Sequence, residues 1–181
     1  MTSRVTCDLW DPFSEITHGF LTRAPGDHPS KGISLKTVCT IDQVHGVDAL
    51  VIRSREQLPR ALQTQADILM TSLPDIALTI RTADCVPLLF FDPVQKAVGA
   101  AHAGWRGSAA GVSQKTIEQF LIHYKSRPQD IRVALGPAIH ACCYEVDQVV
   151  YDQVMTKTCF EPVPHKQKHW KLSLQSLNQS Q

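Results

Sequence analysis

Three residues of the types that bind metals or act as nucleophiles lie at the edges of apolar segments of strand length: His45, Cys85 and His102. Two imidazoles and one thiolate leave the fourth position of a tetrahedral zinc ion open to water or a substrate, so such a site would be catalytic. These residues are tens of positions apart, and a cysteine among apolar residues is commonly a small core residue. Residue type alone leaves both a metal site and a buried thiol open.

A turn with two glycines follows His102, in the segment Gly104-Trp105-Arg106-Gly107. It joins an apolar segment to a helical pattern, so backbone N–H groups at a helix start could bind an anion. Arg106 could add a bidentate contact to a phosphate or a carboxylate. The alternative is a tight turn with Trp105 in the core and Arg106 in solvent, and the local sequence does not decide between the two.

Asp84 and the adjacent pair Cys142 and Cys143 are ambiguous. Asp84 precedes Cys85 and could orient a catalytic group, or cap the following turn, which is the commoner role of such a residue. The two adjacent thiols are expected to point in different directions in any regular structure, so we do not expect them to bind one ion together and interpret them as structural. No Cys-x-x-Cys spacing exists, which excludes a zinc ribbon and a thioredoxin-like motif.

Composition excludes several classes of protein. The chain has 181 residues, 43% of them hydrophobic, which suffices for one globular domain. Eighteen Lys and Arg against seventeen Asp and Glu, with no basic run, argue against a nucleic-acid partner. No apolar stretch approaches the roughly 20 residues that cross a bilayer, so no membrane partner is expected. Without a secretory signal, the six cysteines predict free thiols and a cytoplasmic protein.

The candidate residues must be positioned by secondary structure, which the hydrophobic pattern predicts. Strands are expected at residues 16–22, 48–53, 66–71, 76–82, 86–91, 97–103 and 131–135, the second and third of them paired. Residues 76–82, 86–91 and 97–103 should be adjacent strands of a mixed or antiparallel sheet. Residues 23–32 are rich in proline and glycine and predict a loop.

Helices are expected in the second half of the chain. Apolar residues three and four apart predict a helix from Val112 to Tyr124, and a second one around Val146 to Val154. The tail after Pro164 has a weak pattern and is left unassigned. Strands that are first clustered and then mixed with helices predict an α+β fold of a single domain spanning residues 1–181.

Four stretches, in this order, resemble the laccase-domain family, whose members are also called multicopper polyphenol oxidoreductases, purine nucleoside phosphorylases and peptidoglycan editing factor. They are residues 43–46 (Gln-Val-His-Gly), 82–87 (Thr-Ala-Asp-Cys-Val-Pro), 101–107 (Ala-His-Ala-Gly-Trp-Arg-Gly), and 136–139 (Gly-Pro-Ala-Ile) with 143–146 (Cys-Tyr-Glu-Val). Residues 18–23 also resemble the family's N-terminal motif. Each stretch alone is weak, whereas four in this order are specific.

The resemblance implies a mixed β-sandwich core flanked by helices, with a single zinc bound by His45, Cys85 and His102. Copper could bind the same residues in vitro, since it outcompetes zinc at most nitrogen and sulfur sites. The implied activity is phosphorolysis of adenosine, inosine, guanosine and methylthioadenosine, together with hydrolytic deamination of adenosine.

Phosphate and water are then the co-substrates, and the resemblance gives roles to further residues. Arg106, the backbone at Gly104 and Arg23 are candidates for binding phosphate, and Asp84 for moving a proton. The sequence departs from the family in two places: the segment at residues 24–42 is short, and the family's C-terminal strand segment is expected to be absent.

Three other functions are weighed against this one. A multicopper oxidase needs His-x-His pairs, and none of the eight histidines forms one, which argues against copper clusters. A cysteine-dependent amidase acting on a misincorporated peptidoglycan precursor would use Cys85 as nucleophile and His102 or His45 as base. An inactive, truncated domain is the third alternative.

Overall fold

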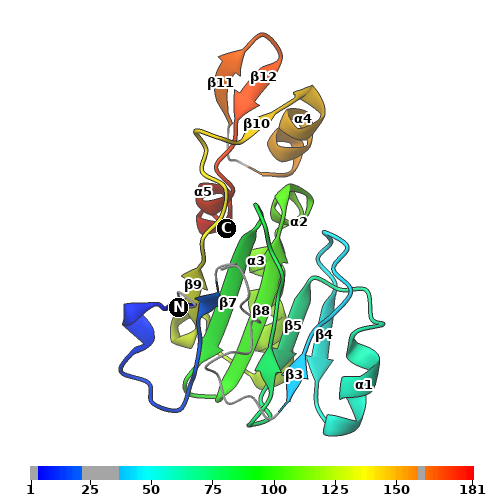
Figure 1. Cartoon of the computed structure of the whole chain (residues 1–181), viewed down its shortest axis with the longest axis vertical. Coiled ribbons are helices and arrows are strands. Elements are labelled where there is room, and N and C mark those ends of the chain that lie inside the picture. The colour runs from blue at the N-terminus through cyan, green and yellow to red at the C-terminus, as the bar shows by residue number, and fades with distance from the viewer. Residues whose placement is uncertain (1–3, 22–36, 159–161) are drawn as a thin grey trace.

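A computed structural model of the chain describes residues 4–21, 37–158 and 162–181, and a five-stranded mixed sheet with the order β4-β5-β8-β7-β9 lies at its centre (Figure 1). Strand β4 (Ala49–Ile52) runs parallel to β5 (Ile68–Thr71). Strands β8 (Ala97–Ala103), β7 (Val86–Asp92) and β9 (Arg132–Leu135) continue the sheet with antiparallel pairings. This confirms five of the strands expected from the hydrophobic pattern, including the pairing of β4 with β5.

Helices cover one face of this sheet. The short helix α2 (Trp105–Ala109) follows β8, and α3 (Val112–Tyr124) packs against β8. Strand β8 is rich in Ala and Gly, which allows close approach: a Cβ at Gly99 would lie 3.0 Å from the ring of Phe120. Gly111, with φ of +80°, makes the turn between the two helices in the left-handed region that glycine tolerates. The helix expected from Val112 to Tyr124 is confirmed.

Smaller elements surround the central sheet. The strands are β1 (Arg4–Val5) with β2 (Phe20–Leu21), β3 (Val38–Cys39) with β6 (Ala77–Leu78), and β10 (Glu145–Val146), β12 (His169–Lys171) and β11 (Val163–Lys166) in that spatial order. The remaining helices are α1 (Leu58–Ala61), α4 (Gln148–Lys157) and α5 (Leu174–Gln179), with 3-10 turns at Asp8–Trp10, Arg55–Gln57 and Pro128–Asp130. The α+β class is confirmed. None of the described helices combines the length and the apolar character needed to cross a membrane.

The expectation for residues 76–82 is wrong in part. Only Ala77–Leu78 form a strand, β6, and it pairs with β3 outside the central sheet. The reason lies in Gln43, whose side-chain amide donates to the backbone carbonyl of Arg81 and accepts from its N–H, at 2.8 and 2.9 Å. These are the groups that a neighbouring strand would use.

Other boundaries also differ from the pattern. Val146 belongs to β10, and the helix after it begins only at Gln148, because the Asp147 side chain caps it by accepting from the N–H of Val150. The tail left unassigned forms β11, β12 and α5. Of the described residues 16–21, Phe20–Leu21 form a strand, and residue 22 and the loop expected at residues 23–32 lie outside the described residues.

The C-terminal helix α5 is seated in the main core. Leu172, Leu174 and Leu177 are buried in the same apolar cluster as β7, β8 and α3. Asn178 is buried, and its Nδ2 donates to Ser108 Oγ of α2 at 2.8 Å and to the carbonyl of Leu174 at 2.8 Å. The helix therefore supports α2, which begins three residues after His102 in the chain.

Candidate metal centre

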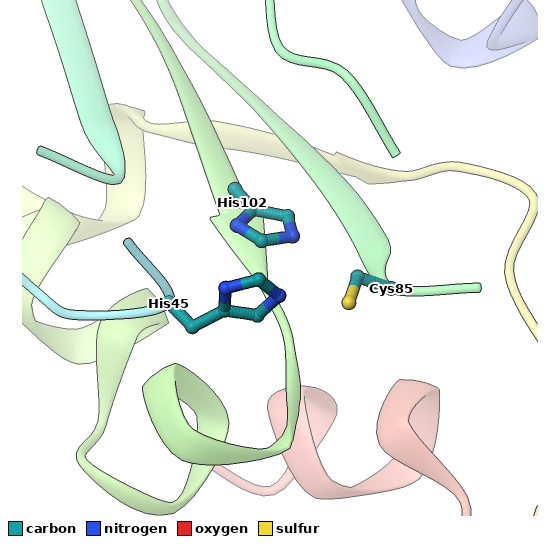
Figure 2. Close-up of side chains that lie close together, drawn as sticks. All are labelled: His45, Cys85 and His102. Atoms are coloured by element: carbon teal, nitrogen blue, oxygen red, sulfur yellow. The ribbon is translucent and has the colours of Figure 1, made fainter. Parts of the chain in front are cut away.

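His45, Cys85 and His102 converge at one end of the central sheet (Figure 2). Their ligand atoms, one nitrogen from each histidine and Sγ of Cys85, all lie within 4.8 Å of one another. Cys85 directly precedes β7 and His102 is the penultimate residue of β8. Because Val86 is paired with Ala103 across the antiparallel ladder, the start of β7 meets the end of β8. The register of two neighbouring strands therefore brings two of the three residues together.

His45 joins them from the loop before β4. Its ring stands edge-on to that of His102, with ring centroids 4.6 Å apart. His45 is exposed, Cys85 is half-buried and His102 is buried, so the cluster is open on one side. A cavity of about 350 Å³ opens there, lined by Asp42, Gln43, His45, Arg81, Thr82, Ala83, Asp84, Cys85 and His102. The arrangement offers three donors to a metal and leaves space for a further ligand.

A buried carboxylate, Asp67, connects the two histidines. Its Oδ1 lies 2.7 Å from His102 Nδ1. The same carboxylate accepts hydrogen bonds from the backbone N–H groups of Val44 (3.1 Å), His45 (3.0 Å) and Gly46 (2.6 Å). Metal-binding histidines commonly engage their second nitrogen with a carboxylate, which leaves the other nitrogen to the metal. Asp67 thus leaves Nε2 of His102 available and also holds the backbone of His45.

Hydrogen bonding changes the ionisation of this pair. Burial opposes the charged form of Asp67, but the hydrogen bond with His102 and the three backbone N–H groups outweigh it, so the pKa of Asp67 is lowered. Burial also disfavours charged His102, yet the hydrogen bonds with Asp67 and Cys85 raise the pKa of His102 to about 9. An imidazole binds metal in its neutral form, so an ion that binds here displaces a proton from His102 at neutral pH.

The backbone of His45 adopts an uncommon conformation. Its φ of +62° lies in the left-handed region, which costs a residue with a Cβ about 1 kcal/mol or more. The three N–H groups bound to Asp67 hold the loop in this shape. The backbone of the loop is therefore held by hydrogen bonds within the protein.

Gly104 provides the space that the cluster needs. A Cβ at this position would lie 2.8 Å from His45 Cδ2 and 3.0 Å from Cys85 Sγ. Two candidate ligands therefore pack directly on the bare backbone of Gly104. Gly104 therefore allows the side chains of His45 and Cys85 to lie against its backbone. This role is additional to any contact of that backbone with an anion.

We expect Gly104→Ala to weaken Zn²⁺ binding by about 10-fold or more, because the added methyl group displaces His45 or Cys85. A competition titration against a chromophoric zinc chelator measures this affinity. Gly99→Ala is the matched control, since its Cβ would meet Phe120 in the core at 3.0 Å. The control should lower the melting temperature and leave Zn²⁺ affinity unchanged. Wild-type affinity in Gly104→Ala would contradict the assigned geometry.

The other candidate residues lie outside the cluster of His45, Cys85 and His102. Asp84 is exposed and lines the cavity beside Cys85. Arg106 is exposed, and its guanidinium stacks on the ring of Trp105 at 4.4 Å. Trp105 is half-buried and packs against the main apolar cluster. Arg23 lies outside the described residues.

Asp67 and Arg81 lie outside the motifs, and Gln43 belongs to one of them but had no assigned role. A signal existed for Asp67, since an acid flanked by apolar residues is almost never fully buried without a partner. Nothing local indicated the hydrogen bonds between Gln43 and Arg81, because they join segments that are far apart in the sequence.

A family model described as multi-copper polyphenol oxidoreductase laccase matches residues 28–181. The chain belongs to this family. The resemblance found in the four motifs is thereby confirmed. Membership of this laccase family does not by itself assign oxidase chemistry, since the chain has no His-x-His pair.

Similar proteins from other organisms are named purine nucleoside phosphorylases. The purine nucleoside phosphorylase of Deinococcus radiodurans is 35% identical over 149 residues, which cover 82% of this chain and 56% of the relative. That of Synechocystis is 37% identical over 153 residues, 79% of this chain and 56% of the relative. The crystal structure of YlmD from Geobacillus stearothermophilus superposes with a TM-score of 0.69 at 34% identity, covering 81% of this chain and 57% of YlmD. The chain spans a little over half the length of these relatives.

Proposed function

We propose that this chain is a zinc-dependent purine nucleoside phosphorylase. The names of its relatives support a nucleoside phosphorylase. One observation connects this function with the candidate metal centre. A single cavity joins the three candidate metal ligands to a cationic residue, Arg81. Zinc is the proposed ion because two histidines and one cysteine with an open fourth position are a donor set of catalytic zinc. Copper could occupy the same residues in vitro.

The proposed substrates are adenosine, inosine, guanosine and methylthioadenosine, with phosphate as co-substrate. A phosphate oxygen forms a bond to C1′ of the ribose while the C1′–N9 bond breaks, and the departing purine takes the electron pair and a proton. When bound, zinc would supply Lewis-acid stabilisation of negative charge on oxygen. His45, Cys85 and His102 would hold it, and Asp67 would keep Nε2 of His102 directed to it.

Phosphate needs cationic and N–H donors beside the cavity. We retain Arg106, the backbone at Gly104 and Arg23 as candidates and add Arg81, which lines the cavity. The backbone of Arg81 is fixed by two hydrogen bonds with the side chain of Gln43, one donated and one accepted by Arg81 N–H and C=O respectively, which favours a defined position for the Arg81 side chain.

We expect Arg81→Ala to raise the phosphate KM about 10-fold or more, because a charge-assisted hydrogen bond contributes about 1.5–3 kcal/mol. Arg106→Ala should likewise raise the phosphate requirement more than it lowers adenosine deamination. Initial rates at varied phosphate and fixed inosine give the KM, and ammonia release from adenosine gives the second activity. Equal loss of both reactions in either variant would assign that arginine to the fold.

Hydrolytic deamination of adenosine is a second candidate activity, favoured by the place of Asp84 on the cavity wall. Water would attack C6 of the purine and ammonia would leave, as in other deaminases that use a carboxylate to move the proton. Asp84 is the carboxylate proposed to take the proton from water and return it to the leaving amino group. Asp84→Asn should therefore reduce ammonia release and leave phosphorolysis of inosine nearly unchanged; equal loss of both would remove this role.

The alternative is a cysteine-dependent amidase acting on a peptidoglycan precursor. The contact between Cys85 and His102 supports it as well, since a thiol beside an imidazole is the arrangement of a cysteine nucleophile. Metal content separates the two functions, because a thiolate bound to zinc is a ligand, whereas a free thiolate alkylates rapidly.

The deciding experiment combines elemental analysis of the purified chain with base release from inosine, with and without phosphate. About one zinc per chain and phosphate-dependent hypoxanthine release would support the proposal. Zinc without turnover would indicate an inactive domain of the family. Absence of metal after purification and zinc supplementation would move Cys85 to the role of nucleophile.

A further inference from the structure

Two adjacent thiols lie on the turn before β10 and take no part in the proposed reaction. Cys142 and Cys143 are both exposed and reduced, and their Sγ atoms lie 3.4 Å apart. The sequence-based expectation that they diverge is wrong, because they lie in a turn and not in a strand, where neighbouring side chains alternate between faces.

The turn that carries them is fixed at both ends. The backbone N–H groups of Cys143 and Tyr144 donate to the carbonyl of His140, at 2.9 and 3.1 Å. Before the turn, the N–H of Ile139 donates to the carbonyl of Asp84 at 2.9 Å, and after it the N–H of Leu172 donates to the carbonyl of Tyr144 at 3.1 Å. The two thiols are therefore presented together by an ordered backbone.

A disulfide is a poor product for this pair. Adjacent Cα atoms across a trans peptide are about 3.8 Å apart, whereas disulfides span about 4.4–6.8 Å between Cα atoms. Direct oxidation would strain the turn. A larger atom placed between the two sulfurs does not need the short sulfur–sulfur bond, so chelation fits the geometry better than oxidation.

The two thiols affect each other's ionisation. The hydrogen bond with Cys142 and the negative charge of its thiolate raise the pKa of Cys143, while the ammonium of Lys171 acts in the opposite direction. Two neighbouring thiolates repel each other. An ion bound by both sulfurs removes their mutual repulsion, and thiolate ligands select soft ions.

We propose that Cys142 and Cys143 form a dithiol site that chelates one thiophilic ion through both sulfur atoms, separate from the cluster of His45, Cys85 and His102. The proposal does not depend on the phosphorylase function. It assigns to the two cysteines a binding role that neither cysteine has alone.

Phenylarsine oxide tests the site, because trivalent arsenic forms a stable ring with two neighbouring thiols. Two As–S bonds form, the arsenic–oxygen bond breaks, and the oxygen leaves as water with the two thiol protons, while arsenic remains trivalent. The full chain is incubated with one equivalent of the arsenical and an excess of 2-mercaptoethanol, then analysed by mass spectrometry. We expect one adduct with the mass of the arsenical less one water, which survives the monothiol and is removed by 2,3-dimercaptopropanol.

Single substitutions locate the adduct. Cys142→Ser and Cys143→Ser should each lose it, and because both positions are exposed, unchanged circular dichroism should show that the variants fold. Cys85→Ser should retain the adduct, which separates this site from the metal centre, and Cys7→Ser is a half-buried control that should also retain it. No monothiol-resistant adduct in the wild type, or an adduct that persists in Cys142→Ser or Cys143→Ser, would overturn the proposal.

Discussion

Cys85→Ser is expected to abolish Zn²⁺ binding and to lower phosphorolysis of inosine more than about 100-fold, beyond the effect of losing an outer hydrogen-bond partner. A serine hydroxyl is neutral and a poor ligand for zinc, whereas the thiolate is a strong one. Cys85 is half-buried at the start of β7 and its Sγ lies within 4.8 Å of both imidazoles, so no other residue of the cluster can replace it. Zinc content after dialysis and inosine turnover are the two measurements.

His102→Ala should have the same two effects, since it removes the ligand that Asp67 orients. Cys7→Ser is the matched control, because it changes a half-buried thiol that is not in the cluster, and both zinc content and turnover should remain at wild-type values. Full activity in Cys85→Ser or His102→Ala would remove the site assignment.

Asp67→Asn is the second substitution with a large expected effect, although Asp67 is not itself a proposed ligand. The change keeps the shape of the side chain but removes the charge that supports His102 and replaces one acceptor by a donor facing the amides of residues 44–46. Loss of such a partner typically costs about 10–100-fold in metal affinity. Zinc affinity by competition titration and phosphorolysis rate at saturating zinc should both fall.

Asp92→Asn separates this effect from a general loss of stability. Asp92 is also a buried aspartate of the central sheet, and its Oδ1 accepts from the N–H groups of Val94 and Gln95 in the turn after β7. Its replacement should lower the melting temperature without changing zinc affinity. If both variants weaken zinc binding equally, Asp67 contributes to the site only through the fold.

The stability of the metal-free chain should depend on pH through the same pair. The pKa of His102 is raised from 6.5 to about 9, so its protonated form stabilises the fold fully below pH 6.5. This contribution disappears as the pH rises through about 9. In chain treated with a chelator, the difference in melting temperature between wild type and Asp67→Asn should therefore narrow from pH 6.5 to pH 9. A difference that stays constant over this interval would show that His102 keeps one protonation state throughout it.

The periodic elements could be predicted from the sequence because they depend on local patterns. Residues 86–91 and 97–103 were expected as adjacent strands, and their antiparallel register places Cys85 beside His102. His45 was a candidate by its residue type and its place beside a predicted strand, but no spacing rule relates it to the other two, and the family resemblance assigned all three to one zinc. The helix from Val112 to Tyr124 could be predicted equally well, because its apolar residues recur three and four positions apart.

The features that failed prediction all depend on contacts between distant segments. The loop of residues 44–46 and the strand that follows Asp67 are linked by one carboxylate, and neither segment carries a local sign of the other. The side-chain amide of Gln43 likewise binds the backbone N–H and C=O groups of Arg81. Arg81 therefore does not join the sheet that the apolar pattern favoured. The direction of the Cys142 and Cys143 side chains depends on a turn that no period describes.

The position of Asp67 has a consequence for exchange of the loop amides with solvent. Asp67 directly precedes β5, a strand buried along its whole length between β4 and β8. The amides of Val44, His45 and Gly46 are bound to that carboxylate, although Val44 and His45 lie in an exposed loop. Such amides exchange only when the element that holds them opens. Their deuterium uptake should therefore be as slow as that of the central sheet, so that the loop and the sheet open as one cooperative unit.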